Sequence, residues 1–191
     1  MKKLIVFVML FAFVACMATA AFAENPIQKG AKALSGFVAN WRSDKPDQGD
    51  TQTSYDIGGA FEYFLTDNGA LRIGVEFAQA DAGKGNKASE SFFSFGYKYN
   101  FRQAEAATFP YLRASYGFGN RKVDVGGTVY YNAYNISTDV NGFGVGLGLE
   151  HLIGNAAVFG EVVYSPTNYK TSGATANSTI LDLNLGLKFY F

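Results

Sequence analysis

Apolar and polar side chains alternate along most of the chain, most regularly in its last eleven residues. Leucine or phenylalanine occupies every odd position from Leu181 to Phe191, and polar residues, glycine or tyrosine occupy the even positions between them. Because strand side chains point alternately to opposite faces, this period of two predicts a strand with one apolar face. The same pattern, punctuated by turn signals, predicts eight strands at about 33–42, 53–65, 70–79, 90–101, 109–124, 129–152, 157–165 and 179–191.

The charged residues inside these strands fall on the face opposite the bulky apolar residues. A lysine or arginine that faces lipid at the middle of a bilayer costs about 2–4 kcal/mol, so this segregation favours a membrane barrel with lipid outside and charges inside. A soluble barrel or sandwich with its apolar face inward would give the same alternation. The polar face of 142–148, however, consists of glycines, which make a poor strand surface. The segregated charges are Asp56, Glu62, Arg72, Glu76, Lys98, Arg113, Glu150, Glu161, Asp182 and Lys188.

The lumen of such a barrel is expected to be filled. Eight strands enclose an interior only wide enough for side chains, so we expect the inward charges to pair with one another and to plug and stiffen the barrel. The inward glycines of 142–148 leave an alternative open, a narrow channel through a partly filled lumen. The expected lumen charge network, with a structural role, comprises Glu62, Arg72, Glu76, Lys98, Arg113, Glu150, Glu161, Asp182 and Lys188.

Composition agrees with a membrane wall. The chain has 16% aromatic residues, 22 glycines and 17% charged residues, whereas an ordinary soluble domain has about 25% charged residues. The predicted fold is all-β, an eight-stranded antiparallel up-and-down transmembrane β-barrel. Aromatic residues are expected in two girdles at the membrane interfaces. One comprises Tyr63, Phe64, Tyr97, Tyr99, Phe101, Phe109, Tyr111, Phe189, Tyr190 and Phe191, and the other comprises Trp41, Phe77, Phe92, Phe93, Tyr116, Phe118 and Tyr164.

The connections between strands orient the predicted barrel. Membrane barrels keep their periplasmic turns short, so the short connections are assigned to the periplasm together with both termini, and the longer loops to the cell exterior. The hairpin around Gly126-Gly127 is expected to rise beyond the bilayer, because about 9–11 residues suffice to cross it. Short turns are predicted at 66–69, 102–108 and 153–156, and larger loops at 43–52, 80–89 and 166–178.

The N-terminus has the features of a secretory signal peptide. Lys2 and Lys3 precede an uncharged apolar run, and small residues at 21–23 precede a cleavage point. We predict a cleaved signal peptide at 1–23 and a single barrel domain at 24–191. Removal of the signal takes away two lysines and no acidic residue, so the formal net charge becomes −2, which gives no reason to expect nucleic acid as a partner.

The only cysteine, Cys16, lies within the predicted signal peptide, so the predicted barrel domain would carry no thiol or disulfide. An alternative is that 13–16 is a degraded lipoprotein cleavage box. In that case Cys16 would be a lipidated first residue.

The C-terminal strand also carries a motif. The pattern Asn184-x-Gly186-x-x-Phe189-x-Phe191 resembles the C-terminal assembly signal by which outer-membrane barrels are recognised for insertion, including its terminal aromatic residue. With the signal peptide, eight strands and short turns, it makes residues 33–191 resemble small outer-membrane beta-barrel-domain proteins, the group of the OmpA transmembrane domain, OmpX and the opacity proteins. The resemblance implies an integral protein of the bacterial outer membrane, whose partners are outer-membrane lipids and the barrel-assembly machinery. We expect it to be a monomer.

The sequence gives no reason to expect a catalytic residue, a cofactor site or a metal site. His151, the only histidine, lies beside the turn at 153–156 on the outward face. Lipid A palmitoyltransferase and deacylase barrels resemble the chain in size but need a histidine near a serine at the opposite end. The glycines of 142–148 alternate with apolar residues in one strand and so do not form a nucleotide-binding loop. A lipid A-modifying enzyme is therefore only a second alternative.

The function that we expect is non-enzymatic. The barrel would display loops for adhesion or ligand contact, or would support envelope integrity, and its expected partner is an extracellular ligand or host surface. The contact candidates are Tyr130, Tyr131 and Tyr134 of the tall hairpin, because tyrosine offers amphipathic contact area at low entropic cost.

Overall fold

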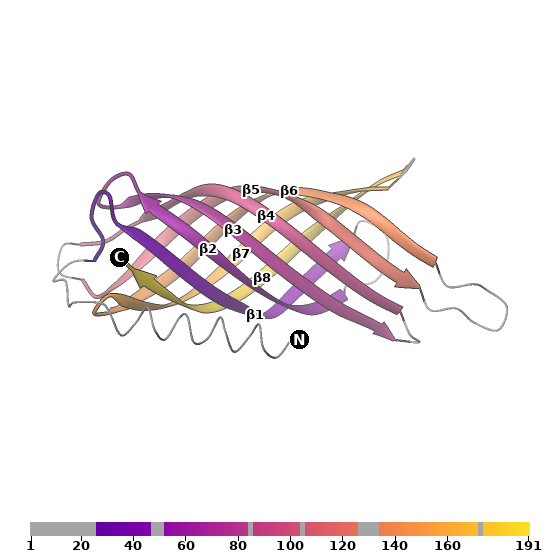
Figure 1. Cartoon of the computed structure of the whole chain (residues 1–191), viewed down its shortest axis with the longest axis horizontal. Helices are drawn as coiled ribbons and strands as arrows, with labels where there is room; N and C mark the ends of the chain where they lie inside the picture. The colour runs from indigo at the N-terminus through magenta and orange to yellow at the C-terminus, as the bar shows by residue number, and fades with distance from the viewer. Residues whose placement is uncertain (1–25, 47–51, 84–85, 104–105, 126–133, 172–173) are drawn as a thin grey trace.

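A computed structural model describes residues 26–46, 52–83, 86–103, 106–125, 134–171 and 174–191. Consecutive strands are antiparallel, and the first strand also pairs with the last, so the sheet closes into a barrel (Figure 1). The predicted fold class is confirmed. None of the described residues forms a helix with the length and apolar character needed to cross a membrane. The strands are β1 (Lys32–Pro46), β2 (Gln52–Phe64), β3 (Gly69–Gly83), β4 (Asn86–Asn100), β5 (Thr108–Val125), β6 (Tyr134–Ile153), β7 (Ala156–Thr171) and β8 (Ala174–Tyr190).

Side chains alternate between the lumen and the outer surface as the sequence pattern predicts. On β6 the glycines from Gly142 to Gly148 are buried, while the apolar residues between them are exposed, with Leu147 reaching 62%. The other strands expose leucine, isoleucine, valine, phenylalanine and tyrosine in the same way, and together these residues form an apolar band around the barrel. A soluble monomer rarely exposes an apolar surface of this extent, whereas lipid acyl chains would cover it.

Two ends of the barrel can be distinguished. The end that we call the turn end carries the first described residues, the chain terminus Phe191 and the connections β2–β3, β4–β5 and β6–β7 (Figure 1). The short turns predicted at 66–69 and 153–156 are confirmed there. Gly154 has a φ of 63°, a left-handed conformation that glycine adopts without strain and that tight hairpin turns require. We call the opposite end the loop end.

The strands continue further toward the loop end than the sequence pattern predicts. β3 and β4 meet across 84–85, and β7 and β8 meet across 172–173, so the loops predicted at 80–89 and 166–178 are wrong. The loop predicted at 43–52 is shortened because strand residues extend into it from both sides. The apolar alternation ends where the wall leaves the apolar band, but the backbone hydrogen-bond ladder continues with serine, threonine and asparagine on its faces.

The tall hairpin is formed by β5 and β6, whose pairing continues to Val125 and Tyr134. The predicted start of this strand at 129 lies outside the described residues. Tyr130 and Tyr131, like the predicted signal peptide at 1–23, lie outside the described residues. Tyr134 is described only as a backbone position at the start of β6.

The predicted aromatic girdles need a correction. Phe64, Phe109, Tyr111 and Tyr190 are at most 2% exposed and point into the barrel, and Phe92 faces the lumen as well. These aromatic residues share the strand parity of the inward charges, so the alternation itself directs them inward. The aromatic residues that do face outward include Tyr63, Phe77, Phe93, Tyr97, Tyr99, Phe101, Tyr116, Phe118, Tyr164 and Phe191.

Candidate functional site in the barrel interior

Four inward side chains from alternate strands meet in the turn-end half of the barrel. They are Glu62 on β2, Lys98 on β4, Glu150 on β6 and Lys188 on β8, which we call the charge cluster. Lys98 Nζ lies 2.5 Å from Glu150 Oε2, and Lys188 Nζ lies 2.9 Å from both Glu62 Oε2 and Glu150 Oε2. None of the four is more than 2% exposed. Two carboxylates and two ammonium groups thus balance one another within one level of the barrel, where alternate strands point their side chains inward.

A second set of polar contacts adjoins the charge cluster. Arg113 Nη2 lies 2.9 Å from Glu161 Oε1. The second oxygen of Glu161 accepts a hydrogen bond from the hydroxyl of Tyr111 at 3.1 Å, and Asn184 Nδ2 donates to Glu161 Oε1 at 3.2 Å. Arg72 Nε lies 3.7 Å from Glu62 Oε1 of the charge cluster. The paired charges cross-link opposite parts of the wall and fill this half of the lumen.

Inward glycines on β6 make room for these side chains. A Cβ atom added to Gly146 would lie 2.9 Å from Arg113 Nε, and one added to Gly148 would lie 2.6 Å from the hydroxyl of Tyr111. Both distances are shorter than carbon atoms tolerate, so a larger residue would displace the arginine or the tyrosine. The glycine alternation of β6 therefore serves the packing of long side chains from β5.

The tyrosines of the interior were not recognised from the sequence as partners of the charges. The hydroxyl of Tyr190 donates to Glu150, and the Lys98 ammonium lies 4.0 Å from the centre of the Tyr111 ring, within the range of a cation–π contact. The strand parity of both tyrosines would have placed them in the lumen. Their hydroxyl groups satisfy carboxylate oxygens that lie away from water.

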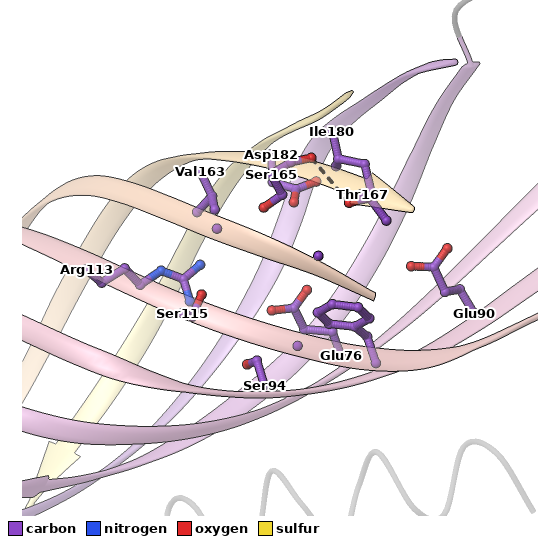
Figure 2. Close-up of a pocket in the computed structure, with 14 residues that line it drawn as sticks. Glu76, Glu90, Ser94, Arg113, Ser115, Val163, Ser165, Thr167, Ile180 and Asp182 are labelled. Atoms are coloured by element: carbon purple, nitrogen blue, oxygen red, sulfur yellow. Dashed lines mark hydrogen bonds between the residues drawn. The ribbon is translucent and has the colours of Figure 1, made fainter. Parts of the chain in front are cut away.

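A small cavity lies on the loop-end side of the charge cluster. Figure 2 shows the carboxylates of Glu76 and Asp182 and the guanidinium of Arg113 around it. Its volume is about 30 Å³, enough for one or two water molecules. Glu76 and Asp182, predicted members of the lumen charge network, thus lie at the cavity and not in the charge cluster. Hydroxyl groups also line it, from Ser94, Ser115, Ser165 and Thr167, together with the apolar side chains of Phe92, Val163 and Ile180.

The only histidine lies away from the charged interior. His151 is exposed on the outer face near the turn end, and its Nδ1 lies 2.7 Å from Thr108 Oγ1. Within the described ranges, no group of three or more histidine, cysteine, aspartate or glutamate residues is arranged to hold a metal ion. The ionised groups of the charge cluster contact one another.

The residues of the predicted assembly signal are spread over both faces of β8. Asn184 points into the lumen, whereas Phe191 is 62% exposed and its ring stacks on Phe189 with 6.4 Å between the ring centres. The backbone N–H groups of Phe191 and Lys32 each donate to the carbonyl of the other at 2.9 Å. The terminal residue therefore completes the seam between β8 and β1. Gly186 lies in the same strand, opposite Phe37 of β1.

Comparison with known proteins settles the family. The model of the outer membrane protein beta-barrel domain family matches residues 8–189. The chain belongs to this family. The protein is therefore an integral outer-membrane β-barrel, and the apolar band is its lipid-facing surface. No curated protein sequence matches the chain significantly.

Solved structures show the same barrel architecture. Neisserial surface protein A is 18% identical with a TM-score of 0.64, over 85% of this chain and 100% of that one. Ail, the attachment invasion locus protein of Yersinia pestis, is 15% identical with a TM-score of 0.55, over 86% and 100%. A major outer membrane protein from Thermus thermophilus is 16% identical with a TM-score of 0.53, over 84% and 99%. At these identities the similarity concerns the fold of the outer-membrane barrel.

Proposed function

We propose that this outer-membrane barrel is a non-enzymatic surface protein that contacts an extracellular partner. The contact is made by the parts of β5, β6 and β7 that continue beyond the apolar band at the loop end, which we call the extension. The observation that carries the proposal is the length of β5 and β6, which contain 18 and 20 residues, whereas about 9–11 suffice to cross a membrane. Anchorage alone does not require this excess. In the proposed orientation the turn end and both chain termini face the periplasm, and the extension stands outside the cell.

The outward face of the extension is polar and internally hydrogen-bonded. Asn120 Nδ2 donates to Ser137 Oγ at 2.9 Å between β5 and β6, and Asn168 Nδ2 of β7 lies 3.5 Å from Asn141 Oδ1 of β6. Paired strands with linked side chains hold their shape better than an irregular loop does. The extension is therefore suited to present a fixed surface to a partner.

One strand edge of the extension offers a mode of contact. β6 pairs with β5 from Tyr134 onward, but its pairing with β7 begins only at Asp139. Thr138 Oγ1 lies 3.1 Å from Thr171 Oγ1 of β7, and among the described residues no strand lies beside 134–137 on that side, so the backbone groups there are available to an added strand. An extracellular polypeptide with an extended segment is the kind of partner that would fit this edge.

Shortening the hairpin tests the proposal. Arg121 and Thr138 are cross-strand neighbours, so replacing 122–137 by Asn-Gly joins them through a two-residue turn that preserves the register. We expect the shortened barrel to assemble normally, and bacteria that display it to bind immobilised serum and extracellular-matrix proteins at least about tenfold less than bacteria with the full barrel.

The matched control is Ser172→Asn, which gives 172–173, between β7 and β8, the same Asn-Gly sequence and should retain binding. Folding of both variants is checked by the shift in gel mobility between unboiled and boiled samples. Equal binding by the full and shortened barrels, or no binding by either, would contradict the proposal.

The non-enzymatic part of the proposal is tested separately. Lipid A from expressing and non-expressing cells is compared by mass spectrometry, and a mass shift would indicate an enzyme instead.

The C-terminal motif supports a second, separate proposal about assembly. We infer that Asn184, Gly186, Phe189 and Phe191 form the signal that the barrel-assembly machinery recognises. Phe191 is largely exposed, so Phe191→Ala removes little packing, and the variant should fold normally into synthetic lipid vesicles. In cells its folded yield in the outer membrane should fall severalfold, and so should the yield of a chain with one residue added after Phe191.

Phe191→Tyr keeps the terminal aromatic ring and serves as the control, with a yield near that of the unaltered chain. Folded protein is measured by heat-dependent gel mobility in isolated outer membranes. A normal yield of Phe191→Ala in cells would refute recognition, and an equal loss in synthetic vesicles would assign the residue to stability instead.

A further inference from the structure

The segment 26–31, which precedes β1, folds across the turn-end mouth of the barrel. Its Ile27 is 0% exposed and packs in an apolar cluster with inward residues of the wall. Gly30 N donates to the Phe64 carbonyl at 2.8 Å, and Lys29 N donates to Asp67 Oδ1 at 2.9 Å, so the segment is held to β2 and to the turn after it. We call this cluster the apolar seal; it comprises Ile27, Ala33, Phe64, Ala70, Phe109, Ala157 and Tyr190.

The apolar seal lies next to the charge cluster. Tyr190 belongs to the seal and also contacts the cluster: its ring lies 5.9 Å from the ring of Phe64, and its hydroxyl donates to Glu150. The side chains of the seal come from β1, β2, β3, β5, β7 and β8, so together they surround Ile27. An apolar layer at this position separates the buried charges from water at the turn-end mouth, which strengthens their mutual attraction.

Ile27 differs from the rest of the seal in one respect. The other members belong to the eight strands of the wall, whereas Ile27 lies in the short segment before β1, whose Lys29, Gly30 and Ala31 bond to the end of β2 and to the turn after it. Withdrawal of this segment would break a few hydrogen bonds and leave all eight strands paired. The wall residues Ala33, Ala70 and Ala157 of the seal have small side chains, which would leave a space at the mouth once Ile27 had moved out.

We propose that Ile27 is a stopper that closes the turn-end mouth to water-borne solutes and keeps the charge cluster dry. The barrel then contains two barriers in series, a removable apolar one at the mouth and a fixed charged one behind it. This device is independent of the contact function proposed above, because it lies at the opposite end of the barrel and involves none of the residues of the extension.

The test uses the absence of cysteine from 24–191. Ala157→Cys introduces a thiol into the apolar seal, and its reaction with a membrane-impermeant methanethiosulfonate is followed on the folded barrel purified from outer membranes. With Ile27 in place we expect slow labelling. With Ile27→Gly we expect labelling at least about tenfold faster, because the reagent enters through the vacated mouth. Ile27→Val, which keeps a branched apolar side chain, should restore slow labelling.

Two further thiols distinguish an opened mouth from a loosened barrel. Gln103→Cys is exposed at the turn end and should react rapidly whether residue 27 is isoleucine or glycine. Ser94→Cys lies at the cavity beyond the charge cluster, and its rate should not change with Ile27→Gly. The proposal is overturned if Ala157→Cys reacts at the same rate in both backgrounds, or if Ser94→Cys accelerates equally. If Ile27→Gly does not fold, Ile27→Ala is used, and an unchanged rate there also overturns the proposal.

Discussion

Replacing Glu150 by glutamine is expected to lower the free energy of unfolding of the barrel by about 3–5 kcal/mol, the usual cost of removing one partner from a buried ion pair. Glu150 contacts the ammonium groups of Lys98 and Lys188 at 2.5 and 2.9 Å, and it accepts a hydrogen bond from the hydroxyl of Tyr190. After the substitution, Glu62 would be the single carboxylate of the charge cluster for two lysines that are at most 2% exposed. The measurement is urea unfolding of the barrel in lipid vesicles, followed by the fluorescence of the only tryptophan.

Charge balance, and not the loss of one contact, is the proposed cause of this instability. The double variant Glu150→Gln with Lys188→Gln restores a neutral cluster, so it should be less destabilised than the two single variants together predict. Glu76→Gln, at the water-sized cavity, is the control and should change the unfolding free energy by less than about 1 kcal/mol. Additive effects of the two substitutions would contradict the argument.

Placing a lysine on the lipid-facing surface is the second large effect that we expect. Leu147 is 62% exposed in the middle of the apolar band on β6. Leu147→Lys should lower the unfolding free energy by about 2–4 kcal/mol, because the ammonium group would lie in the hydrocarbon of the bilayer. The same urea titration in vesicles measures the change.

Asn141→Lys is the matched control. It is on the same strand and has the same outward parity as Leu147, but it lies beyond Phe143 toward the loop end. There a lysine would reach water, and a change of about 0–1 kcal/mol is expected. A similar loss for both variants would mean that the apolar band does not mark the depth of the membrane.

The alternation of apolar and polar side chains predicts most of the fold. Each strand of a lipid-exposed barrel needs apolar residues at every outward position within the membrane, so the pattern marks each strand and its two faces. It also predicted the inward position of the charges. The same rule, applied strictly, would have placed Phe64, Tyr111 and Tyr190 inside as well. Aromatic residues near strand ends usually mark the membrane interface, and this general tendency favours the outer girdle for the three residues although their parity favours the lumen.

The sequence carries no comparable pattern for three other features: where the strands end at the loop end, which inward charges meet, and the burial of Ile27. Beyond the apolar band the outward side chains no longer need to be apolar, so 80–83 and 166–171 lack the apolar alternation in the sequence although the backbone ladder continues. Which charges meet depends on the stagger between neighbouring strands, and alternation within one strand does not define it. For this reason Glu76 and Asp182 could not be separated from Glu62 and Glu150. Ile27 belongs to a short segment without a period, and its burial depends on the closed barrel around it.

The order of the strands in the chain has a consequence for how the barrel closes. The charge cluster takes one residue from each even-numbered strand, and Lys188 comes from the last. Until β8 is in place, Glu62 and Glu150 share one ammonium group within the cluster, that of Lys98. A sheet without its final strand therefore lacks the second ammonium group, and the carboxylates of the cluster outnumber its ammonium groups. Closure of the ring by β8 thus also completes the charge balance of the cluster.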